Sequence, residues 1–249
     1  MNSDNLLSAA HAIQSSNYTV VFTGAGISVE SGIPSFRGKS GLWSKYNPRY
    51  LELDFFLNHP AESWKVMKQI FYDFMAQAQP NPAHYAIAQL EQAGYVKEII
   101  TQNIDNLHQK AGSKIVHEFH GNTRTLMCVE CKTHVLADGI QLDFLPPRCP
   151  YCRGVLKPNF VFFNEMIPEE ISRLSFAAAE KSDVMLLVGT TGEVMPAAML
   201  PYTAKKKNNT TIIEVNPEES LYTPEITDIF LKGKAGEVLP ELTSGILKK

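Results

Sequence analysis

The chain has 249 residues, of which 44% are hydrophobic and 20% are charged. This composition is ordinary for a globular protein, and the length suffices for one large domain with its own core. The net charge of −3 lacks the basic excess of a general nucleic-acid binder. No run approaches the roughly 20 apolar residues of a membrane-spanning helix, and residues 1–14 lack the pattern of a signal peptide. We expect a cytoplasmic monomer, with no specific nucleic acid and no membrane as partner.

The first predicted strand, Tyr18–Thr23, leads directly into Gly24-Ala25-Gly26. A buried strand that turns through glycines into a helix is half of a dinucleotide-binding fingerprint, because glycine lets backbone N–H groups approach a pyrophosphate. The third glycine of that fingerprint is replaced by Val29. On this evidence alone, a simple tight turn is an equally good interpretation.

Further strand-like runs lie at 96–101, 115–119, 160–163, 184–188 and 211–215, with helices predicted between some of them, as at 82–93 and 169–180. This alternation predicts an α/β fold with a doubly wound, Rossmann-like parallel sheet that helices cover on both faces. Such sheets bind ligands at the carboxyl ends of their strands. The proline- and aromatic-rich residues 34–79 are predicted to form a helical cover, and residues 125–157 a small inserted module.

Polar side chains follow the second strand-like run, in the segment Thr101–His108. Gln102, Asn103 and Asp105 together offer hydrogen-bond donors and acceptors, which a carboxamide ligand requires. Asn and Asp also commonly cap turns and helix starts, so a structural role is the alternative.

Two histidines, His117 and His120, follow the third run. On a strand their side chains would point to opposite faces, so we do not expect them to bind one metal together. Histidine is the side chain best suited to moving a proton near neutral pH, and we expect one functional histidine here. His59, His84 and His134 are interpreted as packing or surface residues.

The four cysteines form two C-x-x-C pairs, Cys128/Cys131 and Cys149/Cys152. This spacing predicts a four-thiolate tetrahedral zinc site, in which the filled coordination shell makes the metal structural. Two redox-active pairs are the alternative, but they would need a thioredoxin-like context that is absent.

Taken together, these motifs resemble the sirtuin family over about residues 6 to 245. The segments GAGISVESGIPSFRGKSGLW (24–43), TQNIDNLH (101–108) and the His120-Gly121 pair occur in the family's order, followed by the cysteine module. The resemblance implies a single catalytic domain. It would comprise a large NAD-binding part (approximately 6–33, 80–124 and 158–245), a zinc-ribbon module (125–157) and a helical and cofactor-loop cover (34–79).

The resemblance also implies roles for particular residues. His120 and Asn103 would be catalytic, Phe36 would cover the reacting ribose, and Asp105 would bind the nicotinamide end with Asn103. The residues implied to bind NAD are Gly24, Ala25, Gly26, Ser28, Phe36, Arg37, Gln102, Asn103, Ile104, Asp105, Gly189, Thr190, Thr191, Asn216 and Ala235. The chain departs from the family at Ser35, which is often aspartate, and at Asn164, which is usually glycine.

The implied reaction is an NAD-dependent deacylation of lysine side chains, with NAD consumed as a co-substrate. The acyl oxygen would attack the nicotinamide ribose, and His120 would then take a proton from a ribose hydroxyl. The products would be free lysine, nicotinamide and O-acyl-ADP-ribose. The site would have to align the reactants and delay water.

The implied partners are acyl-lysine proteins or peptides, whose acyl-lysine stem would contact Val161, Phe162 and Phe163. Sirtuins that prefer acidic acyl groups carry a Tyr-x-x-Arg pair after a tryptophan, and counting from Trp64 these positions are Met67 and Ile70. Both are apolar, so acetyl or longer neutral groups are expected over succinyl or malonyl. Two alternatives stay open. One is an NAD hydrolase or mono-ADP-ribosyltransferase on the same scaffold, and the other is an NAD-sensing zinc-ribbon binding module.

Overall fold

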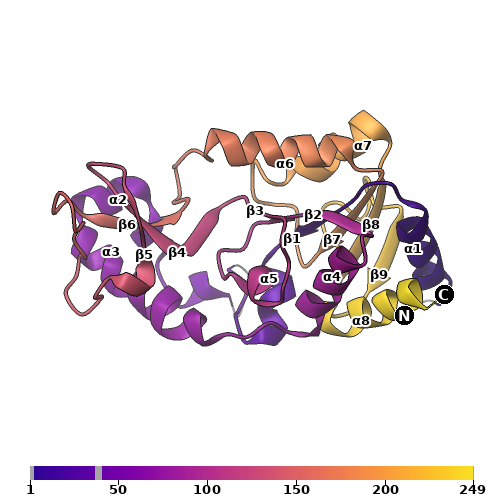
Figure 1. The fold of residues 1–249 in the computed structure, drawn as a ribbon, viewed down its shortest axis with the longest axis horizontal. Coiled ribbons are helices and arrows are strands. Elements are labelled where there is room, and N and C mark those ends of the chain that lie inside the picture. The colour runs from indigo at the N-terminus through magenta and orange to yellow at the C-terminus, as the bar shows by residue number, and fades with distance from the viewer. Residues whose placement is uncertain (1–2, 37–40, 249) are drawn as a thin grey trace.

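The computed structural model describes residues 3–36 and 41–248. Its centre is a six-stranded sheet in the order β3-β2-β1-β7-β8-β9, and every neighbouring pair of strands is parallel (Figure 1). The chain winds from β1 outward to β3 and then restarts at β7 on the other side of β1, so the predicted doubly wound sheet is confirmed. The strands are β1 (Thr19–Thr23), β2 (Val96–Thr101), β3 (Val116–Glu118), β7 (Val184–Val188), β8 (Thr211–Asn216) and β9 (Ile229–Lys232).

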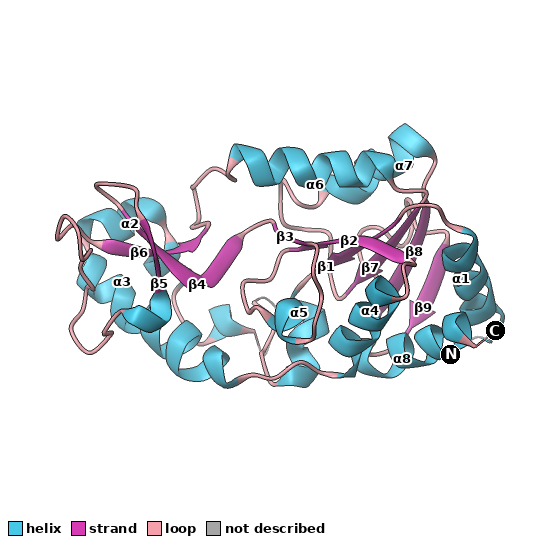
Figure 2. Cartoon of the chain, in the orientation of Figure 1, coloured by secondary structure: helices cyan, strands magenta, loops and turns pink. Residues whose placement is uncertain are grey.

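Helices cover both faces of this sheet (Figure 2). In β1, Val21 packs into the core under one face, and Val20 and Phe22 pack into the core under the other. Strands buried on both faces read as continuous apolar runs, which is why the sequence indicated them clearly. One face is covered by α1 (Ser3–Ser15), α4 (Pro82–Gln92) and α8 (Ala235–Leu247), and the other by α6 (Glu169–Lys181) and α7 (Met199–Asn208). The short helix α5 (Leu107–Lys110) follows β2.

The start of α4 shows how local sequence sets an element boundary. The Asn81 side chain accepts a hydrogen bond from Ala83 N at 2.9 Å, and Pro82 occupies the first helical position. The first N–H groups of a helix have no partner within it. Asn81 accepts from one of them, and Pro82 has no N–H group that would need a partner. Asn81 Nδ2 also donates to Ile27 O at 2.7 Å, so the same residue attaches α4 to the segment that follows β1.

A smaller lobe lies at the far end of the molecule from the chain termini (Figure 1). Its antiparallel sheet has the order β5-β4-β6, and the Trp64 indole donates to Leu156 O of this sheet at 2.7 Å. The predicted helical cover is therefore present and packs on this sheet. The elements are β4 (Gly121–Cys128), β5 (His134–Leu136), β6 (Leu156–Phe160), α2 (Leu53–Asn58) and α3 (Pro60–Met67). Three 3₁₀ segments (42–44, 48–51 and 75–77) and a π-helical turn (68–74) complete the cover, and a fourth 3₁₀ segment (137–139) follows β5.

Two expectations about strands are corrected by the structure. The run at 160–163 is not a strand of the large sheet: β6 covers Leu156–Phe160 and pairs with β4 in the small sheet. An apolar run reports burial, but it does not report which sheet buries it. The sequence also gave no sign of β9, a four-residue edge strand that is only partly buried. Within the described ranges, no helix is long and apolar enough to cross a membrane.

Candidate active site

A cavity of about 940 Å³ lies where β1, β2, β7 and β8 end, between the large sheet and the small lobe. This is the crevice in which doubly wound folds bind nucleotides. Most of the residues proposed from the sequence meet here. Those that line the cavity are Gly24, Ala25, Gly26, Phe36, Gln102, Asn103, Ile104, His120, Val161, Phe162, Phe163, Gly189, Thr190, Thr191 and Asn216.

The glycines hold two loops in backbone contact at the point where the winding of the sheet reverses. Gly24 N donates to Val188 O at 3.0 Å, and Gly26 N donates to Gly189 O at 2.8 Å. These two N–H groups are therefore used within the protein and do not point at a ligand. Ala25 N opens a 3₁₀ segment and forms no hydrogen bond with the described residues. It is the N–H group that suits an anion.

A buried polar cluster holds Asn103 at the cavity wall. Its Nδ2 donates to Gly24 O at 3.1 Å and to Ser28 Oγ at 3.3 Å, and Ser28 Oγ donates to Asp105 Oδ2 at 2.7 Å. Burial raises the pKa of Asp105, although the bonds from Ser28 and from Leu107 N oppose this. Ser28 and Asp105 do not line the cavity and lie behind Asn103. The cluster thus joins the segments that follow β1 and β2.

His120 reaches the cavity from the turn that connects β3 and β4. Its Nδ1 lies 3.0 Å from Gln102 O, and because a carbonyl oxygen only accepts, Nδ1 carries the proton. The other nitrogen, Nε2, then has a free electron pair. Burial lowers the pKa of His120, with the bond to Gln102 opposing it. A neutral imidazole with an available Nε2 is the form that a general base requires. His117, by contrast, pairs with Glu98 and lies outside the cavity.

The opposite end of the cavity is organised by Asn216 and Thr190. Asn216 Nδ2 donates to Thr190 O at 3.0 Å and to Glu214 Oε1 at 2.9 Å, and Gln102 Nε2 donates to Thr190 Oγ1 at 3.0 Å. Glu214 is completely buried, and its other oxygen accepts from the hydroxyls of Thr223 and Thr227. Glu214 was not predicted from the sequence, although a charged residue inside the apolar run TIIEVN was the available signal. Ala235 begins α8 and does not line the cavity.

The small-lobe side of the cavity is aromatic. The rings of Phe36 and Trp43 lie 5.6 Å apart, and those of Trp43 and Phe163 lie 5.8 Å apart. Met67 and Ile70 do not line the cavity; they are buried in the small-lobe core, and Phe71 contributes to the wall instead. Counting from Trp64 assumed which side of the helix faces the ligand, whereas Met67 and Ile70 lie on the side that packs into the small-lobe core. Arg37 lies outside the described residues.

The departure at Asn164 has a conformational explanation. Its backbone φ is +64°, in the left-handed region. Glycine adopts this region without strain, and asparagine is among the few other residues that tolerate it. Asn164 therefore adopts a conformation that glycine at this position would adopt equally well.

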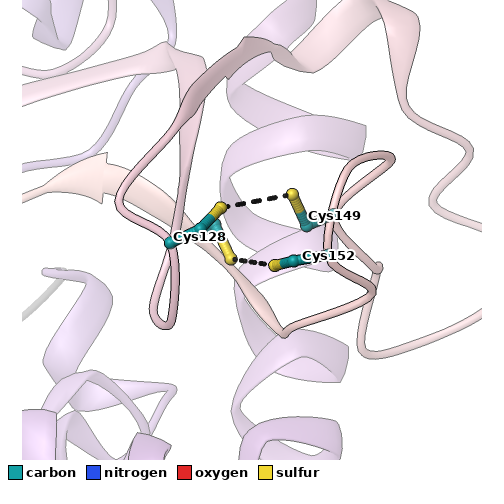
Figure 3. Close-up of side chains that lie close together, drawn as sticks. Cys128, Cys149 and Cys152 are labelled. Carbon is teal, nitrogen blue, oxygen red and sulfur yellow. Dashed lines mark hydrogen bonds between the residues drawn. The ribbon is translucent and has the colours of Figure 1, made fainter.

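The four cysteine sulfurs converge although they come from two separate loops. All four lie within 4.8 Å of one another. The distances are 3.4 Å between the sulfurs of Cys128 and Cys152 and 3.8 Å between those of Cys131 and Cys149. Figure 3 shows Cys149 and Cys152 facing Cys128 across the gap between the loops. A tetrahedral ion with bonds of about 2.3 Å would place sulfurs about 3.8 Å apart, so this donor set fits zinc.

The fold and this cavity define an α/β protein with a nucleotide-binding crevice. The Sir2 family model matches residues 24–196. A relative from Pyrobaculum aerophilum, named NAD-dependent protein deacylase 2, is 44% identical over 98% of this chain and 96% of its own length. The chain therefore belongs to the Sir2 family, and the identification of an enzyme of the sirtuin family is confirmed.

Solved structures agree with this assignment. A Sir2 homologue in complex with NAD has a TM-score of 0.90 and 40% identity, with 100% of this chain and 95% of that chain covered. A Sir2 complex with a p53 peptide and NAD⁺ has a TM-score of 0.87 and 34% identity, with 98% of each chain covered.

Proposed function

We propose that this chain is an NAD-dependent protein-lysine deacylase that prefers neutral acyl groups and holds one structural zinc ion. The observation that carries the proposal is the pairing of His120 and Asn103 in one buried cavity. A neutral imidazole with a free Nε2 and a fixed carboxamide lie between a nucleotide-type crevice and an aromatic wall.

The relatives support the NAD-dependent deacylase part of this proposal. The relative from Pyrobaculum aerophilum is named an NAD-dependent protein deacylase, one related structure holds NAD, and another holds a peptide together with NAD⁺. The residues of this chain fit the same ligands, because Ala25 N suits a phosphate. It lies in the cavity beside the close backbone contact between Gly26 and Gly189.

When bound, NAD would supply a ribose carbon whose bond to nicotinamide can break. Asn103 would bind at the nicotinamide end, since its side chain is held by Gly24 and Ser28 and cannot turn away. His120 Nε2 would take a proton from a hydroxyl, while Gln102 O holds the ring and stabilises the proton on Nδ1. Phe36 and Trp43 would exclude water from the reacting atoms.

The preference for neutral acyl groups follows from the charge of the cavity. Among the described residues that line it there is no lysine or arginine, while Glu193 and Glu219 contribute carboxylates. Along this described lining, a succinyl or malonyl tail would find no cation to pair with and would be repelled. Phe71, which lines the cavity where Met67 and Ile70 were expected, offers no charged partner either.

The test of the activity is mass spectrometry of an acetyl-lysine peptide incubated with the protein and NAD. We expect the deacetylated peptide and O-acetyl-ADP-ribose in equal amounts. The variant His120→Ala is the control and should form neither product. Nicotinamide release without any acylated peptide would instead indicate an NAD hydrolase. Transfer of ADP-ribose to protein would indicate a transferase.

The test of acyl preference compares acetyl-, succinyl- and longer neutral acyl-lysine in one peptide sequence. We expect kcat/KM to be at least tenfold lower for the succinyl peptide, equivalent to about 1.4 kcal/mol of lost transition-state stabilisation. Faster turnover of the succinyl peptide would refute this part of the proposal and leave the deacylase reaction itself intact.

A further inference from the structure

Lys157 is a lysine buried in the interior, directly beneath the aromatic wall of the cavity. Its side chain is 3% exposed. It lies on β6, where its neighbours along the strand, Leu156 and Pro158, are also buried. Fully buried lysines are rare unless they are paired, because removing an ammonium group from water is costly. This position therefore calls for a specific explanation.

The ammonium group of Lys157 is fully engaged by its surroundings. Its Nζ donates to Phe160 O at 2.7 Å and to Pro158 O at 3.2 Å, and it forms an ion pair with Glu165 Oε2 at 3.0 Å. It also lies over the ring of Phe162, 4.2 Å from the centroid. Burial lowers the pKa of Lys157, and Glu165 opposes this shift.

Glu165 connects Lys157 to the wall of the cavity. The carboxylate oxygen that pairs with Lys157 also accepts a hydrogen bond from Phe162 N at 2.8 Å. Glu165 N in turn donates to Phe162 O at 3.1 Å, which closes the turn that contains Asn164. Both the ring and the backbone of Phe162 are thus held by the pair.

The segment that the pair holds, residues 161–165, is a wall of the cavity. Its other backbone bonds go to two different parts of the site. Val161 N donates to His120 O at 2.9 Å, and Phe163 N donates to Leu51 O at 2.9 Å. Within the described part of the chain, only the side chain of Glu165 accepts from Phe162 N, which lies between these two anchors. If the pair were lost, Phe162 N would lose this hydrogen bond, and Phe162 could move between the two anchors.

We propose that Lys157 and Glu165 act as one unit that positions Phe162 and the 161–165 wall for the acyl-lysine stem. This inference rests on the proposed function, because the stem is the ligand of that wall. Neither residue touches the reacting atoms; both are positioning residues. The NAD end of the cavity is built by the segments after β1, β7 and β8 and does not depend on the pair.

The experiment uses the full chain as wild type, Lys157→Met, Glu165→Gln and the double variant. Each replacement keeps the approximate length of the side chain and removes its charge. The control is Lys205→Met, which breaks a different ion pair, with Asp228, away from the cavity. For every protein we would measure KM and kcat for an acetyl-lysine peptide, the dissociation constant of NAD, and thermal unfolding.

We expect KM for the peptide to rise about tenfold or more in Lys157→Met and several-fold in Glu165→Gln, with NAD affinity within about twofold of wild type. The double variant should be no worse than Lys157→Met, since removing both partners leaves no buried unpaired charge. Lys205→Met should keep the wild-type KM. A general loss of stability would weaken NAD and peptide binding together, so the separation of the two constants distinguishes positioning from simple damage.

Three results would overturn the inference: an unchanged peptide KM in both single variants, an equal loss of NAD affinity, or single effects that simply add in the double variant. If Lys157→Met does not fold, Glu165→Gln and the double variant decide the question by the same constants. An inactive wild-type protein would count against the proposed function, and an active wild type with unaffected variants would count against the pair alone.

Discussion

Replacing Gly189 by alanine tests the backbone contact on which the nucleotide crevice depends. Gly189 has a φ of +62°, and a Cβ added there would lie 2.3 Å from Ile27 N and 2.6 Å from Gly26 C. Ordinary van der Waals contact for a Cβ starts at about 3.4 Å. The two loops would therefore have to separate by about 1 Å, and neither atom belongs to a flexible side chain.

The magnitude can be worked out against a matched control. Gly94 also has a positive φ, +82°, but a Cβ there would meet nothing within 4 Å. Alanine in the left-handed region costs about 1–2 kcal/mol, offset by about 0.4–1 kcal/mol of reduced unfolded-state entropy, so Gly94→Ala should cost about 1 kcal/mol. Overpacking adds about 1–3 kcal/mol at Gly189, for a total of about 2–4 kcal/mol.

The assay is urea unfolding of both variants and of wild type, together with calorimetric titration of NAD. Gly189→Ala should lose both stability and at least about tenfold in NAD affinity, since 1.4 kcal/mol corresponds to a factor of ten. Gly94→Ala should bind NAD as wild type does. Equal destabilisation of the two variants, or unchanged NAD affinity in Gly189→Ala, would refute the argument that the close approach of the loops builds the site.

Three further predictions concern other parts of the molecule. Chelation of zinc should release one metal ion per chain and abolish the near-UV circular dichroism of the small lobe, because four-thiolate sites couple metal binding to folding; metal analysis that finds no zinc would contradict this. Burial lowers the pKa of His84 to about 4 and that of His108 to about 3. As the pH falls below about 6.5, both histidines become protonated in the unfolded chain but stay neutral in the folded one. Each should therefore lower the free energy of unfolding by about 1.4 kcal/mol per pH unit, down to its folded-state pKa. Urea titrations that give equal stability at pH 7 and pH 5 would exclude this. Finally, Asn164→Gly should retain activity, whereas Asn164→Val should lose about 1–2 kcal/mol of stability through left-handed strain; a stable Asn164→Val protein would show that the turn is not strained.

The parts of the site that sequence analysis anticipated share a physical property. Gly24, Asn103 and Asn216 follow strands that are buried on both faces, and the carboxyl ends of parallel strands meet at one edge of the sheet. A continuous apolar run followed by polar residues therefore indicates both the strand and its place in the cavity. The cysteine spacing was equally informative, because four thiolates at this spacing have few other uses.

The parts that were missed depend on packing between elements. Met67 and Ile70 were placed by counting along a helix, but the orientation of that helix is set by its contacts with the small sheet, such as the bond from Trp64 to Leu156. Glu214 and Lys157 are charged residues within buried strands, and only their tertiary partners show why they are there.

The sequence by itself determined the class of the fold, a doubly wound parallel sheet, together with the polar residues at the strand ends, the cysteine module and membership of the Sir2 family. Tertiary structure alone decided which backbone groups remain for a ligand. The N–H groups of Gly24 and Gly26 donate to Val188 O and Gly189 O, whereas that of Ala25 has no partner among the described residues and is available to a ligand in the cavity. The physical reason is that local sequence sets backbone conformation and burial, whereas hydrogen-bond partners and the direction of a side chain depend on segments distant in the chain.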